Sequence, residues 1–231
     1  MLKIENTDIV GWEAAIRGMR NPMNSWEKSD SKYGCGNDKE YFCDECSSSF
    51  HCTSREKTYN VGLNDLDLMT RLRNAGTDHR KFMRMITVYV DITAPLYWWK
   101  EFDTYKVGTV ANSCSTMHKI HAKEFTLDDF STEHLYPEVR EAFENTIIKY
   151  LNEARKTYNF LSDTPSKKDA WWQMIQVLPT SYNQRRTVML NYEVLANIYK
   201  SRKGHRLDEW REFCKWIESL PYSELITGEK K

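Results

Sequence analysis

Apolar residues recur at helical spacing through most of the C-terminal half of the chain. One amphipathic run begins with Pro137, a residue favoured in the first turn of a helix, and a later run stops at Pro179. A third run ends at Gly204, and the last stops before Pro221. This half is therefore predicted to be helical over residues 137–161, 167–178, 181–203 and 205–220.

The N-terminal half mixes strand and helix signals. β-Branched residues alternate with other side chains up to Pro95, which is typical of a strand, and the run after this proline predicts a helix. Residues 64–76 predict another helix, with an N-cap at Asn64 or Asp65 and a stop at Gly76.

The first sixty residues combine a compact start with a long polar excursion. Residues 8–22 predict the end of a strand followed by a short helix, whereas residues from about 25 to 60 are rich in Ser, Gly, Asn and Cys. No internal repeat or low-complexity linker divides the chain. We therefore predict a single α+β domain over residues 1–231, with early strands and a helix-rich C-terminal half.

The stretch from Leu190 to His205 carries an unusual pair of polar residues. Its apolar positions have helical spacing, yet Asn191 and Arg202 fall on the same side, because eleven residues make almost three whole turns. One interpretation is that Arg202 lays its stem on the core and keeps its guanidinium in water. The other is that this face lines a polar site.

Composition and charge narrow the classes of function. Lys+Arg and Asp+Glu both number 33, and a formal charge of zero argues against a broad nucleic-acid surface. The polar start does not resemble a signal peptide, and Asp91 and Pro95 interrupt the longest apolar run. A cytoplasmic protein with no membrane or nucleic-acid partner is expected. The eight Trp and thirteen Tyr favour stacking surfaces, a subunit interface or a large core.

Four of the six cysteines lie within the polar excursion. Cys43 and Cys46 form one CxxC pair, and the outlying Cys35 and Cys52 could complete a tetrahedral zinc site. A single CxxC with irregular flanks is a weak signal. Free thiols on a surface loop and a redox pair are the other interpretations.

The sequence has no glycine-rich phosphate loop, HExxH, GxSxG or kinase signature. Instead, a set of features follows a characteristic order along the chain. Gly76 and a charged turn come first, and the predicted strand through Asp91-Ile92 follows them. A predicted helix comes next, and Asn112 and Ser115 follow this helix. This order resembles the flavin-dependent thymidylate synthases, in which a GH-E-S-like turn precedes a strand, a helix and an RHRxxSxNxxSxRY-type signature. Aligning Asp91-Ile92 with the family's Glu-Ile places Asn112 and Ser115 on its NxxS pair without a gap.

The C-terminal half is similar to the same family independently. In the family's pattern, an Asn lies twelve residues after the Pro of a Leu-Pro pair. A second Asn lies six residues after the first Asn, and an Arg lies eleven residues after the first Asn. Pro179, Asn191, Asn197 and Arg202 keep these distances without a gap. The family's His-Ala-Gln-x-Glu-Ile-Arg element is matched, one residue early, by His205, Glu209 and Arg211.

The resemblance implies a fold, a cofactor and a set of site residues. It implies a phage or bacterial origin and a homotetramer whose sites are shared between subunits and bind a pyrimidine nucleotide. The implied reaction is the transfer of a methyl or hydroxymethyl group to this nucleotide with the help of reduced FAD. Arg202 would stabilise the charge that develops on the pyrimidine ring. The remaining implied residues are Asn191, Asn197, His205 and Lys106 for the cofactor, and Ser115, Asn112, Arg185 and Arg186 for the substrate.

Several of the family's cations are missing. The family's RHR triad aligns with Tyr105, Lys106 and Val107, and its signature serine aligns with Val110. The final Arg-Tyr of the signature aligns with Met117 and His118. The family's phosphate-binding arginine aligns with Ile175, and a further arginine aligns with Glu193. Each lost charged hydrogen bond costs about 1.5–3 kcal/mol. Lys106, Arg185 and Arg186 are the evident substitutes, although two adjacent arginines on a helix diverge by about 100°.

Two functions of different classes follow. The first is a flavin-dependent thymidylate synthase-like enzyme or a relative acting on another pyrimidine. The second is a catalytically degenerate member of the fold that acts as a binding or assembly protein. In that case the cysteine segment would be the surface that binds a partner, and a structural zinc ion would hold it together. A zinc-dependent nucleic-acid partner is a third, disfavoured by the neutral charge.

Overall fold

The structure is a computed structural model that describes residues 1–35 and 57–228. The predicted zinc ligands Cys43, Cys46 and Cys52, and the side chain of Cys35, lie outside the described part. Within that part, no group of three or more His, Cys, Asp or Glu side chains could hold a metal ion. Nor does it contain a helix long and apolar enough to cross a membrane.

The chain forms two compact units, and each is made of segments that are distant in sequence. The sheet–hairpin unit comprises residues 1–7, 89–189 and 204–213, and the helical unit comprises residues 8–88, 190–203 and 214–231. Three strands and one helix run from one unit into the other: β1 (Lys3–Val10), β4 (Thr87–Pro95), β6 (Asn183–Asn191) and α8 (Asp208–Ser219).

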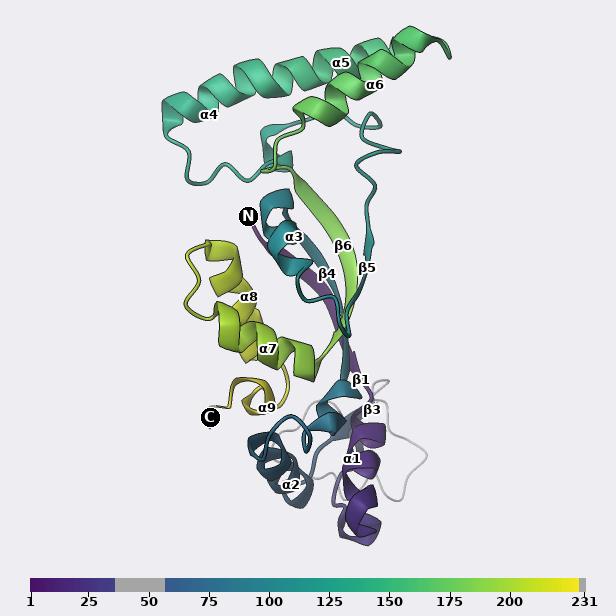
Figure 1. Cartoon of the computed structure of the whole chain (residues 1–231), viewed down its shortest axis with the longest axis vertical. Coiled ribbons are helices and arrows are strands. Elements are labelled where there is room, and N and C mark those ends of the chain that lie inside the picture. The colour runs from purple at the N-terminus through teal and green to yellow at the C-terminus, as the bar shows by residue number, and fades with distance from the viewer. Residues whose placement is uncertain (36–56, 229–231) are drawn as a thin grey trace. The chain divides into compact units, whose positions relative to one another are not determined.

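The chain forms a four-stranded sheet with the strand order β1-β4-β6-β5 (Figure 1). The predicted strand before Pro95 is confirmed as β4, in which Val88, Val90 and Ile92 are buried and the residues between them are more exposed. β5 (Val110–Ser113) pairs antiparallel with β6. The α+β class is thus confirmed.

Much of the aromatic content lies in the core of the sheet–hairpin unit. Trp98 and Trp99 of α3 (Leu96–Phe102) are fully buried, and the Trp98 ring lies 4.7 Å from that of Trp210. The indole Nε1 of Trp99 donates to the carbonyl of Gln184 at 2.9 Å and fixes α3 to β6. These tryptophans serve packing within the unit.

The predicted helix over residues 181–203 is wrong in its first half. Asn183–Asn191 is the strand β6, and the helix α7 spans Tyr192–Arg202. Gln184, Val188 and Leu190 are buried while their neighbours are more exposed, which is the period of a strand. Hydrogen bonding to the neighbouring strands decided the conformation of a run whose apolar spacing also suits a helix.

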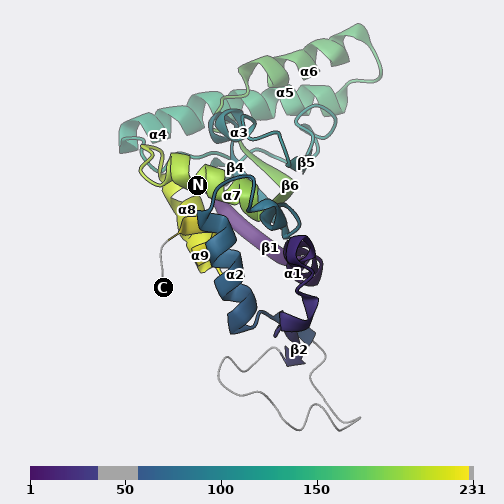
Figure 2. The same ribbon diagram turned by 60° about the horizontal axis from the view of Figure 1, so that its bottom comes forward.

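The sheet–hairpin unit also contains a long helical hairpin. Its elements are α4 (Pro137–Phe143), the π-helical turn η6 (Glu144–Ile148), α5 (Lys149–Phe160) and α6 (Pro165–Val177), preceded by the short helix η5 (Leu127–Asp129). α5 and α6 lie side by side in both views (Figures 1 and 2). Both predicted helices are confirmed, the first with one π-helical turn that the sequence pattern does not reveal.

The helical unit combines several helices with a short β-hairpin. Its elements are α1 (Trp12–Arg20), η1 (Asn21–Met23), η2 (Trp26–Lys28), the hairpin of β2 (Lys32–Cys35) and β3 (Lys57–Asn60), α2 (Leu63–Asn74), η4 (Lys81–Arg84), α7 and α9 (Glu224–Thr227). The helices predicted over residues 8–22 and 64–76 are thus confirmed as α1 and α2.

The N-cap predicted for α2 is wrong. The cap residue is Gly62, and Asn64 and Asp65 lie inside the first turn. Their backbone N–H groups donate to the carboxylate of Asp30, at 2.9 and 3.1 Å. A Cβ on Gly62 would lie 2.2 Å from the Asp30 carboxyl carbon, so glycine makes this approach possible. A side chain from another segment therefore replaces the local cap.

Candidate functional site

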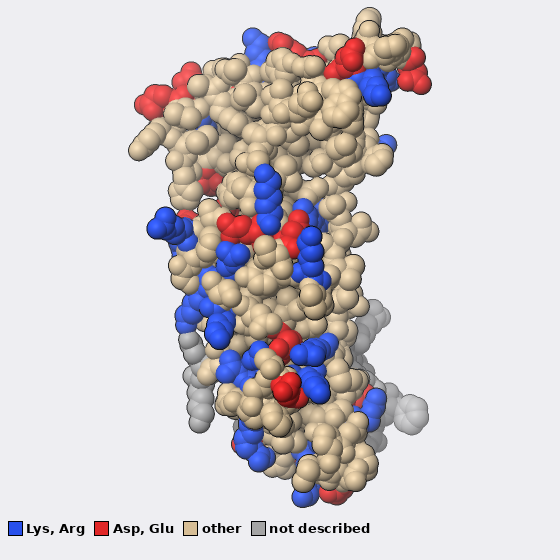
Figure 3. All heavy atoms as spheres, in the orientation of Figure 1, with Lys and Arg blue, Asp and Glu red and all other residues tan. Residues whose placement is uncertain are grey.

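The helical unit contains a basic cavity of about 610 Å³ between α2, α7 and α9. Four cationic side chains line it, Arg73, Arg80, Lys200 and Lys203, together with the amide of Asn197. The described lining includes no Asp or Glu. Figure 3 shows Lys and Arg side chains gathered over α7 and α9. A cavity with this lining suits an anionic ligand.

Arg73 is fixed by the carbonyl groups of α9. Its Nε and Nη2 donate to the carbonyls of Leu225 and Ile226, both at 3.2 Å. Gly228 has a φ of 78°, and a Cβ there would lie 2.4 Å from the guanidinium. Burial, and then the nearby charge of Arg80, lower the pKa of Arg73. An anion in the cavity would relieve this repulsion between the two cations.

Arg80 reaches α7 at the place where the family's pattern has an arginine. Its Nε lies 2.9 Å from the Glu193 carboxylate, and its Nη2 donates to Asn197 Oδ1 at 3.5 Å. Glu193 stands at the position of that arginine in the family's pattern, and Arg80 brings a guanidinium beside Asn197. Asn197, which the resemblance predicts to contact the cofactor, thus lies in the basic cavity.

The other predicted residues of the helical unit lie at the two ends of α7. Asn191 is the N-cap, and its side-chain oxygen accepts the N–H of Val194 at 3.0 Å. Arg202 is half-buried in the last turn, and it is not among the described residues that line the cavity. Capping explains the amide at position 191, because this residue lies just before the first turn of α7 and its side chain accepts a backbone N–H of that turn.

A hydrogen-bonded group on the sheet brings together further predicted residues. The carboxylate of Asp91 on β4 accepts from Thr187 Oγ1 at 2.5 Å, Asn6 Nδ2 at 2.8 Å and Arg185 Nη2 at 2.7 Å. These three donors hold the pKa of Asp91 well below its usual range. Asn112 on β5 lies directly opposite Thr187.

Arg185 and Arg186 point to opposite faces of the sheet. They are neighbours on a strand, so their side chains alternate by about 180° rather than the 100° expected on a helix. The Arg186 guanidinium lies 4.2 Å from the ring centroid of Trp99 and donates to Asp103 at 2.9 Å. The predicted pair of substrate cations is therefore divided, and Arg186 packs against α3.

The remaining predicted residues lie in loops of the sheet–hairpin unit. Ser115 Oγ accepts the N–H groups of Met117 and His118, at 3.1 and 3.0 Å. Lys106 is exposed between α3 and β5. His205 Nδ1 accepts the N–H of Leu207 at 3.2 Å, and its Nε2 lies 3.4 Å from a Glu101 oxygen. The hydrogen bonds of Ser115 are thus local, whereas His205 also contacts Glu101 of α3.

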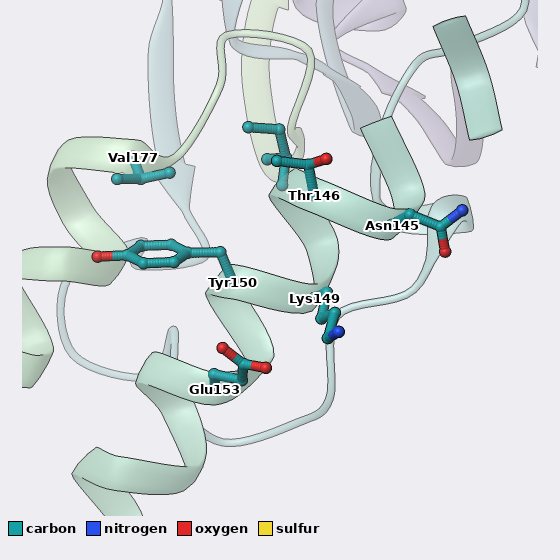
Figure 4. A pocket seen from close by; sticks show the side chains of 7 residues that line it. Asn145, Thr146, Lys149, Tyr150, Glu153 and Val177 are labelled. Atoms are coloured by element: carbon teal, nitrogen blue, oxygen red, sulfur yellow. The ribbon is translucent and has the colours of Figure 1, made fainter. Parts of the chain in front are cut away.

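A second cavity, of about 480 Å³, lies beside the π-helical turn. Figure 4 shows Tyr150 extending from α5 toward Val177 at the end of α6. Tyr150 donates to the side chain of Gln173 at 2.6 Å. None of the predicted site residues lines this cavity.

The four cations of the basic cavity are candidate site residues that the sequence did not single out. They come from the end of α2, the turn before η4, and α7. Only Lys200 and Lys203 leave a signal, because they follow Asn197 at intervals of three residues and so share its side of the helix.

Fold and site together define a chain with the fold of the flavin-dependent thymidylate synthases. Thymidylate synthase X from Helicobacter pylori, crystallised with FAD and dUMP, has a TM-score of 0.65 at 14% identity, over 99% of this chain and 98% of that chain. A second structure of that enzyme with FAD and dUMP gives 0.63 at 16% identity, over 99% and 100%. The UMP/dUMP methylase PolB from Streptomyces cacaoi, bound with 5-Br dUMP, gives 0.56 at 12% identity, over 99% and 95%.

These likenesses establish the fold over nearly the whole chain. No family model and no curated protein sequence matches it. The resemblance found from the residue spacing is thus confirmed at the level of the fold.

Proposed function

We propose that the protein is a flavin-dependent transferase that acts on a pyrimidine nucleotide, and that the basic cavity binds the phosphate groups of FAD. The observation that carries the proposal is the cavity itself, with four cations around Asn197 in a thymidylate synthase fold. The structural neighbours were crystallised with FAD and dUMP, which supports the choice of both ligands. The protein is expected to act as a homo-oligomer.

Each group of residues has a defined task in this proposal. Bound FAD, once reduced, would supply a hydride to the pyrimidine. Lys200 and Lys203 would neutralise the diphosphate, Arg80 would remain beside Asn197 through its contact with Glu193, and the Asn197 amide would orient the cofactor. A fixed guanidinium at Arg202 would stabilise negative charge on the pyrimidine ring.

Colour and thermal stability test the proposal directly. The purified protein is expected to absorb as a yellow flavoprotein and to release FAD on denaturation. Added FAD should raise the melting temperature, because a ligand that binds only the folded state stabilises it by RT ln(1 + [L]/Kd). A colourless protein that FAD fails to stabilise would instead support a binding or assembly role. The missing RHR cations favour that alternative.

Arg202 is the residue expected to act on the substrate. Arg202→Ala should lower nucleotide affinity or turnover about tenfold or more, with the fold intact. Arg202→Lys should recover little, because an ammonium keeps the charge without the planar two-pronged donor. Steady-state kinetics, or calorimetry with dUMP, would measure both effects.

Arg206→Ala is a matched control, since Arg206 is exposed and lies four residues further along the chain. If Arg202 serves only as a surface residue with a packed stem, both alanine variants will bind nucleotide like the wild type.

A further inference from the structure

The helical segment 137–160 of the sheet–hairpin unit is covered along only part of its length. It runs without interruption through α4, the π-helical turn η6 and α5. α6 packs along α5, and α4 extends past the end of α6 in both views (Figures 1 and 2). Residues 137–142 are all exposed. A helix that projects from its unit in this way offers a long surface to a partner.

The net charge of this helix changes sign at its middle. The first half, residues 137–148, carries three carboxylates and one guanidinium, a net charge of −2: Glu138, Arg140, Glu141 and Glu144. The second half, residues 149–160, carries three cations and one carboxylate, a net charge of +2: Lys149, Glu153, Arg155 and Lys156. The two halves therefore attract each other when two such helices lie antiparallel, and repel when they lie parallel.

Three pairs of opposite charges are also symmetric about a single point of the helix. The pairs are Glu138 with Lys156, Arg140 with Glu153, and Glu144 with Lys149. Their midpoints along the sequence all fall at residues 146–147, inside the π-helical turn. When two copies pair antiparallel about a two-fold axis at this point, each of the six charges lies opposite a charge of the other sign.

These six side chains are not neutralised within their own chain. All six are exposed, and none of them forms an ion pair within residues 1–35 and 57–228. Arg140 and Glu144 are four residues apart, as are Lys149 and Glu153, a spacing that allows ion pairs on a helix surface. The charges are thus available to a partner molecule.

Exposed apolar side chains lie along the same segment. Tyr136, just before the helix, is 76% exposed, and Phe160, its last residue, is 88% exposed. Antiparallel pairing brings the start of one helix to the end of its counterpart, so these two rings come close together. The cavity of about 480 Å³ lies at the axis, with Thr146 and Tyr150 in its lining. Apolar burial would supply the affinity, and the charges would select the orientation.

We infer that this surface binds a second copy of the chain, through antiparallel pairing of the two 137–160 helices about a two-fold axis at the π-helical turn. Such a contact is isologous, because both copies use the same surface. The inference does not rest on the proposed function, since no residue assigned to FAD or to the nucleotide lies on this helix. It specifies one interface of the expected homo-oligomer, together with its orientation and register.

Two charge-reversal variants of the full-length protein test the pairing. The basic variant carries Glu138→Lys and Glu144→Lys, and the acidic variant carries Lys149→Glu and Lys156→Glu. Each variant alone places like charges opposite one another and should weaken self-association by about tenfold or more, as measured by sedimentation velocity. An equimolar mixture of the two should associate again, because both contacts of the mixed dimer then join opposite charges. All four changes in one chain should restore self-association for the same reason.

Lys100→Glu with Lys119→Glu is the control, because it gives the net charge of the acidic variant and alters exposed residues outside the helix. This control should associate like the wild type, and circular dichroism verifies that every variant is folded. Equal weakening in the control, or a mixture that does not associate again, would overturn the inference. So would a wild type that stays monomeric at micromolar concentration, or reversal variants that associate as strongly as the wild type.

Discussion

Replacing Lys200 and Lys203 together by glutamine is expected to weaken FAD binding about hundredfold. Both side chains are exposed at the basic cavity, so the substitutions remove two charges without opening the core. A hydrogen bond to a charged group contributes about 1.5–3 kcal/mol, and each 1.4 kcal/mol changes affinity tenfold. Equilibrium titration followed by flavin fluorescence measures the change.

The matched control removes two cations elsewhere in the helical unit. Arg17 and Arg71 are exposed, pair with Glu13 and Asp67 one helical turn away, and do not line the cavity. The double variant Arg17→Gln, Arg71→Gln has the same net charge as the cavity variant and should bind FAD normally. Salt should weaken FAD binding to the wild type more steeply than to the cavity variant. Equal losses in both double variants would attribute the effect to net charge and remove the cavity as the FAD site.

The fold can be predicted from the sequence where local pattern and tertiary environment agree. β4 is such a case, because its buried and exposed residues alternate and it ends at Pro95. The segment 181–203 is not, because its apolar residues suit two periods and only pairing with β5 and β4 selects the strand. The mistaken helix boundary also changed the interpretation of Asn191. Once β6 is recognised as a strand, Asn191 is the N-cap residue of α7.

The candidate site is predictable only where its residues are consecutive on one element. Asn197, Lys200 and Lys203 share a side of α7 and could be identified from spacing. Arg73 and Arg80 reach the same cavity from segments more than a hundred residues earlier in the chain, and no local pattern indicates that approach. The separation of Arg185 from Arg186 likewise depends on strand geometry.

Asp65→Asn is expected to lower the free energy of unfolding by about 3–5 kcal/mol, because it breaks a buried ion pair and leaves Arg20 without its counter-charge. The Asp65 carboxylate is fully buried and accepts Arg20 Nε at 2.7 Å. It also accepts the hydroxyls of Ser29 and Ser31, at 2.7 and 2.6 Å, and so attaches the base of the polar excursion to α2. Urea unfolding followed by circular dichroism measures the loss.

Asp67→Asn is the control two residues further along α2. Asp67 pairs with Arg71 on the surface, both side chains being about two-thirds exposed, so this change should cost less than about 1 kcal/mol. Replacing both partners, as in Arg20→Met with Asp65→Leu, should recover only part of the loss. The backbone N–H groups of Asp30 and Ser31, which donate to Asp65, would still lack an acceptor.

Acid should remove the contribution of Asp65. Burial alone would raise its pKa, but hydrogen bonds from Ser31, Ser29 and Arg20 together bring it below the ordinary value of 3.8. A carboxyl group whose pKa is lower in the folded state stabilises the fold fully above its unfolded pKa, and that stabilisation is lost as pH falls through the folded value. The difference in unfolding free energy between wild type and Asp65→Asn should therefore be constant from about pH 5 to 7 and shrink below about pH 4. A difference that stays unchanged in acid would mean that the charge on Asp65 does not stabilise this network.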